Sequence, residues 1–393
     1  MVELLAPAGT FLKLKTAFKF GADAVYFAGK KFGLRAFAGN FEDDEIEKAV
    51  NYAHSLNKKV YITVNILAHE ADFDGLKEYI EYLDKIGVDA VIVADVGIIK
   101  LIRDVAPNLD IHVSTQANVT NSYSAKFFQD MGVKRIVLAR ELSIEEIKKI
   151  HEAVPDIELE AFVHGAMCIS YSGRCLLSNY FTGRDSNRGA CVQACRWEYT
   201  ITEKSRQGQQ FPIEEDERGT YILNSKDLCM IKHLKELEEA GVCSFKIEGR
   251  MKSEYYVACT VNAYRRAING EDVDISELEK SSHRLFTTGF YFGEKDKECF
   301  TSSSPVQTHE FMALVLEDAK DGYVKIEQRN RFKVGDTLEV LSPDENFNKK
   351  IKVTEIKNLK GELIDDAKKV QEVLYLKVEL ALKEGDILRA EKA

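Results

Sequence analysis

The stretch FDGLKEYIEYLDKIGVDAVIVAD, residues 73–95, holds a helix, a turn and a strand in sequence, and it decides the fold. Up to Ile86, apolar side chains recur at helical spacing with charged ones between them. Gly87-Val88-Asp89 is typical of a helix end followed by a turn. The run AVIVAD, residues 90–95, is almost continuously apolar, as expected of a parallel strand buried on both faces. The stretch therefore predicts one unit of a parallel α/β fold.

The same pattern recurs through the first 250 residues. One of the helical segments, SIEEIKKIHEAV, opens with a capping box of Ser143 and Glu146. Eight such units in roughly 250 residues predict a TIM-like (β/α)8 barrel. A doubly wound open sheet is the runner-up, but its G-x-G-x-x-G fingerprint is missing from LLAPAGTFLKLK after the first strand. The predicted strands are residues 3–9, 24–29, 60–65, 90–95, 111–116, 135–140, 159–165 and 244–249.

The pattern is interrupted between the seventh and eighth predicted strands. Residues 166–243 are too long for an ordinary βα loop, and they contain six of the eight cysteines and the only tryptophan, Trp197. From about residue 309, short alternating segments are separated by DG and GD turns, which indicates antiparallel strands. We predict a barrel domain at 1–270 with this Cys-rich insertion, a linker region at 271–308, and a small β-barrel domain at 309–393.

Composition limits the class of protein. With 45% hydrophobic and 30% charged residues, the chain resembles soluble globular proteins. Its net charge of −10 excludes a uniformly basic nucleic-acid coat, although a local basic patch stays possible. The start, MVELLAPAGTF, lacks a secretory signal pattern, and the apolar runs are too short to span a membrane. We expect a cytoplasmic protein without a membrane partner, whose reduced cysteines serve metal binding or catalysis more than disulfides.

The cysteines of the insertion follow an unusual spacing. Six residues lie between Cys168 and Cys175, fifteen between Cys175 and Cys191 and three between Cys191 and Cys195, and Cys229 ends the motif DLC. Zinc knuckles usually pair cysteines as C-x2–4-C, which only Cys191 and Cys195 resemble. The wider spacing suits a long loop around a bulkier centre such as an iron–sulfur cluster. Reduced cysteines that act as small apolar side chains, a redox dithiol and disulfides are the alternatives.

Polar side chains recur where the predicted strands end, and in a barrel these ends converge on one face. Arginines there suit a small dianion or nucleic-acid phosphates, because guanidinium groups bind such anions through two parallel hydrogen bonds. We predict catalytic roles for Gln116, Arg140, His164 and Glu248, and substrate binding by Arg35, Asn65, Ser114 and Arg250. The strand ends and loops also hold Asp95, Glu141, Arg184, Arg188 and Arg196. The alternative for Asp95 is a role as a helix cap. The alternative for Arg184 and Arg188 is a solvated position on the surface.

Signatures of hydrolases are scarce. The sequence contains no HExxH and no GxSxG motif. His164 lies close enough in sequence to Cys168 and Cys175 to suggest a thiol dyad. A cysteine that ligates a cluster is not a free nucleophile, so the dyad and the cluster are competing interpretations.

The segments EAFVHGAMC (160–168) and GRCLLS (173–178) resemble the signature of the U-32 peptidase (collagenase-like) family. Further segments similar to that family are ELLAPAG (3–9), STQ (114–116), NSKDLC (224–229) and KIEGRMKS (246–253). The resemblance covers most of residues 1–270, and the C-terminal region is similar to that of the longer members.

The resemblance implies RNA chemistry despite the family name. Some members convert the wobble uridine of tRNA to 5-hydroxyuridine with prephenate, others hydroxylate a cytidine of ribosomal RNA, and a related pair acts in ubiquinone hydroxylation. The length and the single C-terminal domain look most like the tRNA class. The resemblance then implies prephenate as co-substrate, tRNA as partner, a same-family partner protein as a further option, and a 4Fe–4S cluster on Cys168, Cys175, Cys191 and Cys229, with Cys195 as the alternative fourth ligand.

For a tRNA partner we expect a local basic surface formed by Lys252, Arg265, Arg266, NRFK (330–333) and NFNKKIK (346–352). Three other functions stay open: a protease, as the family name says, an rRNA cytidine hydroxylation factor, and a non-catalytic RNA-binding factor.

Overall fold

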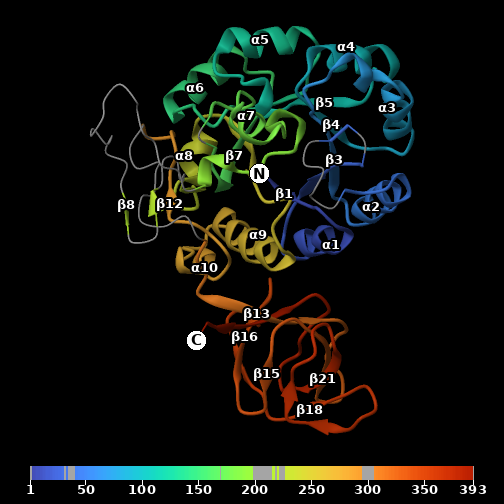
Figure 1. The fold of residues 1–393 in the computed structure, drawn as a ribbon, viewed down its shortest axis with the longest axis vertical. Coiled ribbons are helices and arrows are strands. Elements are labelled where there is room, and N and C mark those ends of the chain that lie inside the picture. Colours follow the sequence, from blue (N-terminus) through green and yellow to red (C-terminus); the bar gives the residue numbers. More distant parts are fainter. Residues whose placement is uncertain are drawn as a thin grey trace. The chain divides into compact units, whose positions relative to one another are not determined.

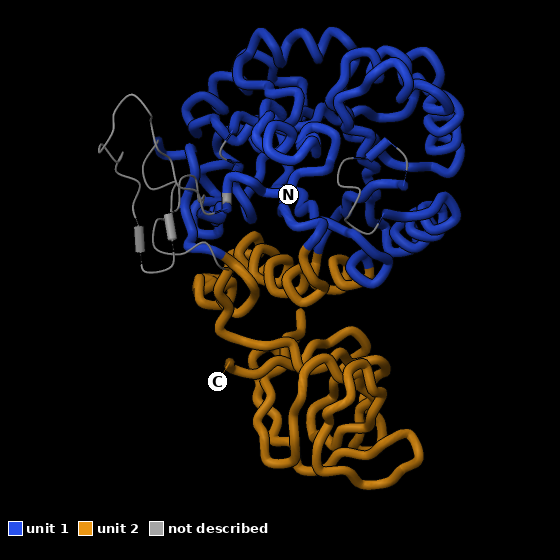
Figure 2. The backbone as a smooth tube through the Cα atoms, in the orientation of Figure 1, with its two compact units in different colours: residues 1–14, 22–251, 284–304 blue, residues 15–21, 252–283, 305–393 orange. Residues whose placement is uncertain are grey.

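The computed structural model describes residues 2–30, 32–33, 40–168, 170–197, 215–216, 219–220, 226–293 and 305–392. The chain divides into two compact units, which are coloured in Figure 2. The first comprises 1–14, 22–251 and 284–304, and the second comprises 15–21, 252–283 and 305–393. Each unit draws on separate segments, whereas the sequence predicted contiguous domains. In the described ranges, no helix has the length and apolar character needed to cross a membrane.

Eight parallel strands form the barrel of the first unit (Figure 1). They are hydrogen-bonded in the order β11-β1-β2-β3-β4-β5-β6-β7, and β11 also pairs with β7, which closes the sheet. This confirms the TIM-like barrel and excludes the doubly wound open sheet. The strands are β1 (Glu3–Pro7), β2 (Ala24–Phe27), β3 (Lys59–Val64), β4 (Ala90–Val93), β5 (Asp110–Val113), β6 (Arg135–Val137), β7 (Glu158–Ala166) and β11 (Val242–Ile247).

Amphipathic helices alternate with these strands, and Figure 1 shows α2 to α6 around the outside of the sheet. Their ends follow the sequence signals: Ser143 and Glu146 form the predicted capping box, and Gly87 after α3 has φ +80°. Asp95 accepts hydrogen bonds from the amides of Gly97 (2.8 Å) and Ile98 (3.1 Å), so it is a helix cap. The helices are α1 (Phe11–Lys19), α2 (Asp43–Ser55), α3 (Leu76–Lys85), α4 (Val96–Val105), α5 (Ser122–Asp130), α6 (Ile144–Ala153) and α8 (Leu234–Glu239).

Strand β7 continues beyond the barrel. Its last residues pair antiparallel with β10 (Asp227–Cys229), which itself pairs parallel with β12 (Phe286–Thr287). The expected linker region 271–308 therefore contributes a strand to the first unit, and its Tyr291 is buried there. Periodicity gives no signal for β12 because the strand has only two residues. The insertion also contains α7 (Leu177–Thr182), η3 (Ser186–Arg188), η4 (Ala194–Arg196), β8 (Glu215–Asp216) and β9 (Gly219–Thr220).

Charged side chains occupy the barrel interior near the ends at which the strands begin. The Nη1 atom of Arg135 lies 2.5 Å from Glu3 Oε1 and 3.1 Å from Glu160 Oε2. Lys246 Nζ donates to Glu160 Oε1 at 2.7 Å, and both side chains are buried. Burial by itself raises the pKa of Glu160, but Lys246 and Arg135 hold that pKa below its ordinary value. Glu160 is therefore an ionised group whose charge is balanced inside the barrel.

The second unit contains an antiparallel sheet, as predicted. Its strand order is β17-β16-β22-β13-β14-β21-β18-β19, around a core that includes Val324, Ile326, Val340, Leu374 and Leu388. Closure of this sheet into a barrel stays a prediction. The elements of the unit are α9 (Glu254–Ile268), α10 (Ser276–Glu279), β13 (His309–Val315), β14 (Tyr323–Gln328), β15 (Phe332–Lys333), β16 (Thr337–Leu341), β17 (Lys350–Lys352), β18 (Ile356–Lys357), β19 (Leu363–Ile364), β20 (Asp366–Ala367), β21 (Val373–Lys377) and β22 (Ile387–Glu391).

We predict that Glu160→Leu lowers the free energy of unfolding by about 3–5 kcal/mol, because it leaves buried cations without their partner. Urea unfolding of the full chain measures this change. The double variant Glu160→Leu/Lys246→Met should be less destabilised than the single one, since it removes both charges of one pair. Glu81→Gln, which removes an exposed partner 3.8 Å from Lys77, is the control and should change stability by less than about 1 kcal/mol. Equal effects of Glu160→Leu and Glu81→Gln would contradict the prediction.

Candidate functional site

Three of the predicted site residues meet where β3 and β5 end. Asn65 Nδ2 donates a hydrogen bond to Gln116 Oε1 at 2.8 Å and to Ser114 Oγ at 3.4 Å. The Ser114 hydroxyl also accepts the amide of Gln116 at 3.3 Å, which starts the short helix η2 (Thr115–Ala117). The structure thus brings Asn65, Ser114 and Gln116 into one polar cluster at the carboxyl ends of the strands.

The loop that carries Cys168 and Cys175 lies directly against this cluster. The Ser172 amide donates to Glu141 Oε1 at 2.8 Å, and Thr115 Oγ1 donates to Ser172 Oγ at 3.4 Å. Gly173 has φ +72°, and a Cβ at this position would lie only 2.2 Å from the carbonyl oxygen of Gln116. Only glycine permits this close approach of two backbones. The loop is therefore fixed over the strand ends by its own sequence.

Arg140 and His164 flank the point where β7 leaves the barrel. Arg140 Nη1 donates to the carbonyl of Ala166, and its guanidinium carbon lies 3.8 Å from the centre of the Phe162 ring. His164 is buried, and its ring centre lies 5.6 Å from that of Phe286. The carbonyl of His164 accepts the amide of Glu248 at 2.9 Å. These predicted residues therefore lie at one end of the β7–β11 seam.

Arg250 is buried and hydrogen-bonded within the protein. Its side chain is buried, with Nη2 donating to Asn40 Oδ1 at 2.9 Å and Nη1 to Thr63 Oγ1 at 3.4 Å. A fixed, buried guanidinium at the end of β11 is suited to orienting neighbours or a bound anion. Arg35, predicted as a substrate ligand, and the side chain of Arg196 lie outside the described residues.

The four cysteines expected to bind a cluster lie in different environments. Cys168 and Cys191 are exposed, Cys175 is half-buried and Cys229 is buried. Although Cys168 has an exposed surface, surrounding protein atoms partly desolvate its thiol, which raises its pKa against the lowering effects of the Ser170 amide and Arg140, and Cys175 and Cys191 raise it further. The charges of Cys175 and Cys191 thus act on Cys168.

The pKa of Cys175 is shifted in the opposite direction to that of Cys168. Burial raises the pKa of Cys175, but the Ser170 hydroxyl and the Leu177 and Ser178 amides outweigh burial, so the pKa is lowered. The Ser186 hydroxyl donates to the Cys175 carbonyl at 2.7 Å. Cys191 Sγ also accepts a backbone hydrogen bond, from Gln193 N at 3.3 Å. Donors that surround a sulfur favour the thiolate, which is the form that binds metals.

Cys229 and Cys195, the two candidates for the fourth ligand, lie in different elements. Cys229 lies on β10 opposite His164, and Cys168 follows two residues after Ala166, the partner of Asp227 in the same ladder. Cys195 is half-buried at η4. In the parts of the chain that the structure describes, no three His, Cys, Asp or Glu side chains form a metal-binding group. The 4Fe–4S cluster therefore stays a prediction.

Arg188 binds within the protein. Its Nη1 and Nη2 atoms donate to the two carboxylate oxygens of Asp72 at 2.6 and 2.8 Å. This pair lowers the pKa of Asp72 to about 2 and fastens the insertion to the segment after β3. Sequence reasoning missed Asp72 and Ser172 because both depend on a partner distant in sequence. Glu160 and Lys246 did leave a signal, since each is a charge inside an apolar strand segment.

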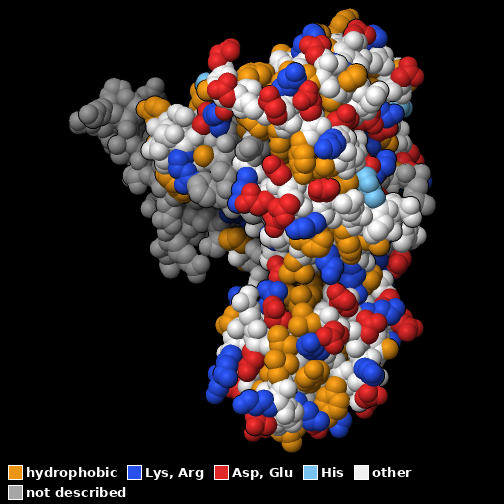
Figure 3. Space-filling model, turned by 90° about the vertical axis from the view of Figure 1, so that its right-hand side faces the viewer, with side chains coloured by type: hydrophobic (Ala, Val, Ile, Leu, Met, Phe, Trp, Pro, Cys, Tyr) orange, Lys and Arg blue, Asp and Glu red, His pale blue; other side chains and the backbone are white. Residues whose placement is uncertain are grey.

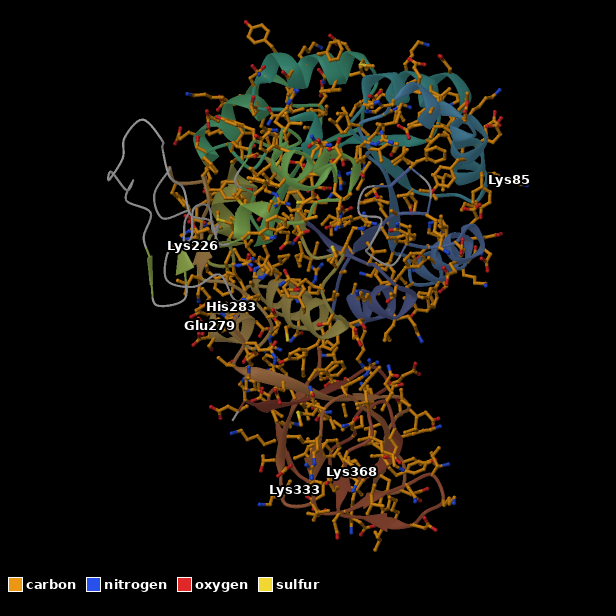
Figure 4. The ribbon with its side chains drawn as sticks, viewed as in Figure 1. Lys85, Lys226, Glu279, His283, Lys333 and Lys368 are labelled. Carbon is orange, nitrogen blue, oxygen red and sulfur yellow. The ribbon has the colours of Figure 1, made fainter. Side chains whose placement is uncertain are left out.

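The basic residues expected to contact tRNA are largely engaged within the second unit. Arg265 Nε donates to Gly21 O at 2.7 Å, Arg266 pairs with Glu271 at 2.5 Å, and Lys252 donates to Ser282 O at 3.0 Å. Lys333 is exposed on β15, and Figure 4 shows it near Lys368 at the paired strand β20. On the face drawn in Figure 3, acidic and basic side chains alternate without a basic stripe. The expected surface stays a prediction.

Two family models match the chain. The model for peptidase family U32 matches residues 9–301, and the model for the U32 C-terminal domain matches residues 307–389. The chain belongs to peptidase family U32. The matches cover the barrel from residue 9 onward, its insertion and most of the antiparallel sheet.

Relatives within the U32 family carry different names. The "tRNA hydroxylation protein P1" of Bacillus subtilis is 40% identical over 99% of this chain and 95% of its own length. The "23S rRNA 5-hydroxycytidine C2501 synthase" of Escherichia coli is 40% identical over 72% of this chain but 41% of its own length. The "Collagenase" of Porphyromonas gingivalis is 32% identical over 74% of this chain and 72% of its own length. Of these three, the first is similar over nearly the whole of both chains.

We predict that Gly173→Ala displaces the cysteine loop, because the added methyl group meets the Gln116 carbonyl in a backbone conformation that L residues rarely adopt. Gly183→Ala is a matched control in the same insertion, with φ +70° and no atom within 4 Å of the added Cβ. The control should lower the free energy of unfolding by about 1–2 kcal/mol. Gly173→Ala should lower it further, or speed limited proteolysis of the insertion. Identical behaviour of the two variants would show that the contact is unimportant.

Proposed function

We propose that this protein hydroxylates tRNA, converting the wobble uridine to 5-hydroxyuridine with prephenate as co-substrate. The observation that carries the proposal is the similarity over nearly the full length of both chains to a relative named tRNA hydroxylation protein P1. The E. coli relative named for rRNA hydroxylation supports RNA hydroxylation more broadly, since the shared region spans 72% of this chain.

The proposed cofactor is a 4Fe–4S cluster on Cys168, Cys175, Cys191 and Cys229, with Cys195 as the alternative fourth ligand. Support comes from the hydrogen-bond donors around Cys175 and Cys191 and from the electrostatic coupling of Cys168 to both. When bound, such a cluster supplies one-electron redox chemistry whose potential depends on hydrogen bonds to its sulfurs and on local charge.

The protein's own groups would bind and orient the substrates. A guanidinium has five N–H donors, so Arg140 can hold a carboxylate of prephenate while it retains its bond to Ala166. The carboxamides of Asn65 and Gln116, already joined at 2.8 Å, offer a fixed polar edge for a base or a hydroxyl group. His164 and Glu248, whose backbones are joined by a hydrogen bond of 2.9 Å, are the titratable residues that we propose exchange protons with the bound substrates.

A protease function is the second candidate, because a relative 32% identical to this chain is named Collagenase. It requires an activated nucleophile or a metal-bound water, and the sequence contains neither HExxH nor GxSxG. Gelatin cleavage by the purified protein, abolished in a site variant, would favour this candidate over hydroxylation.

We predict that Cys168→Ala lowers the iron content of anaerobically purified protein and removes wobble hydroxylation in cells that rely on this gene. Iron analysis, absorbance near 400 nm and mass spectrometry of tRNA nucleosides measure the two effects. Cys243→Ala is the matched control, since Cys243 lies on β11 with its thiol 3.4 Å from the Leu159 carbonyl, and both readouts should persist.

Two outcomes would contradict the proposal. If the iron content and the hydroxylation are both unchanged in Cys168→Ala, Cys168 does not bind a cluster that the reaction needs. Unaltered tRNA nucleosides in cells that lack the gene, together with a missing 5-hydroxycytidine in ribosomal RNA, would move the activity to rRNA.

A further inference from the structure

Residues 171–197 of the insertion expose an unusual number of large apolar side chains. Single exposed apolar residues are normal in proteins, but clusters of them indicate binding surfaces. In this segment the side chains of Tyr171, Leu176, Tyr180, Phe181 and Trp197 are 62, 70, 83, 47 and 41% exposed. Four of the five are aromatic, and three of these rings lie together.

These three rings, Tyr180, Phe181 and Trp197, form what we call the aromatic ridge. The ring centres of Tyr180 and Phe181 are 5.4 Å apart, and those of Phe181 and Trp197 are 6.5 Å apart. Tyr180 and Phe181 lie on α7, and Trp197 directly follows η4. Two different parts of the insertion therefore contribute to one exposed aromatic surface.

The charge of the same segment is opposite to that of the chain. Residues 171–197 contain four arginines and a single acidic residue, Asp185, a net charge of +3 (four minus one) in a chain of net charge −10. Arg188 is paired with Asp72, and the side chains of Arg174 and Arg184 are exposed. An open hollow next to the ridge is lined by Asn179, Gly183, Arg184, Asp185, Arg188, Ala190 and, from outside the segment, His69.

We propose that the aromatic ridge, with Arg174 and Arg184, binds unpaired nucleotides of an RNA loop. Bases stack on exposed aromatic side chains regardless of sequence, and arginines bind the phosphates between them. The positive charge of the segment favours a polyanion over a protein partner. The inference rests on the proposed tRNA function and names the surface that would bind the RNA. The same segment supplies Cys175 and Cys191, two of the proposed cluster ligands.

The test is RNA binding by the full-length protein, measured with an unmodified tRNA transcript. A blunt RNA duplex, which offers no unpaired bases along its length, is the control. Phe181→Ala and Tyr180→Ala should each weaken transcript binding about 5- to 100-fold, because each removes a stacking platform. Phe181→Tyr should retain binding. Arg184→Gln should reduce the slope of log affinity against log salt by about 0.7, the loss of one single-strand phosphate contact.

Phe127→Ala is the matched control. Phe127 is 54% exposed on α5, and its ring centre lies 5.4 Å from that of Phe128, the same separation as in the ridge pair. This variant should bind the transcript like the unaltered protein. Thermal unfolding of all variants distinguishes a lost platform from a lost fold.

Each other outcome overturns the inference. Unchanged binding in both ridge variants, an equal loss in Phe127→Ala, or equal affinity for transcript and duplex would exclude base stacking at the ridge. Loss of self-association with unchanged RNA binding would make the ridge a protein interface. The proposed function fails separately, through tRNA nucleosides that do not change when the gene is deleted.

Discussion

The pairing of β7 with β11 is the interaction on which the rest of this molecule depends, because it closes the barrel. The Glu160–Lys246 ion pair spans this seam at 2.7 Å. Removing two charges from water is unfavourable by several kcal/mol for each ion, so such a pair requires further partners. Arg135 supplies one at 3.1 Å from Glu160, and the Ser244 hydroxyl donates to the same carboxylate at 3.3 Å. A slipped register would separate these charges, so the network also specifies how the sheet closes.

The same seam creates the candidate site. Its register shifts between Lys246 and Ile247, which places Ile247 opposite His164 and lets β7 turn away from the barrel. Gly165 permits the turn with φ +110°, since a Cβ there would lie 2.8 Å from the Glu248 carbonyl. Beyond this point the chain passes over Gln116 at Gly173 and later returns as β10, opposite β7. The polar strand ends and the cysteine loop are thus neighbours because of how the barrel closes.

The sequence predicted those features that depend on local chemistry. Apolar runs located all eight barrel strands, and the cap at Ser143 and the turn at Gly87 followed from single residues. Features that depend on distant partners were not accessible. Arg188 meets Asp72 across 116 residues, and Arg265 meets Gly21 across 244, so a run of basic residues does not reveal which of them face solvent. β12 was missed because two residues carry no periodicity.

Residues 171–197 carry a net charge of +3 and also supply Cys175 and Cys191, so the proposed cluster and the proposed RNA surface would share one part of the chain. A cluster held by thiolates carries net negative charge, and nearby cations favour the thiolate form and raise the reduction potential. Arg140 already lowers the pKa of Cys168 through its charge. RNA phosphates held at Arg174 and Arg184 would bring negative charge to the same segment and partly cancel this effect. On the two proposals together, RNA bound at Arg174 and Arg184 would lower the reduction potential of a cluster held in part by Cys175 and Cys191 of the same segment.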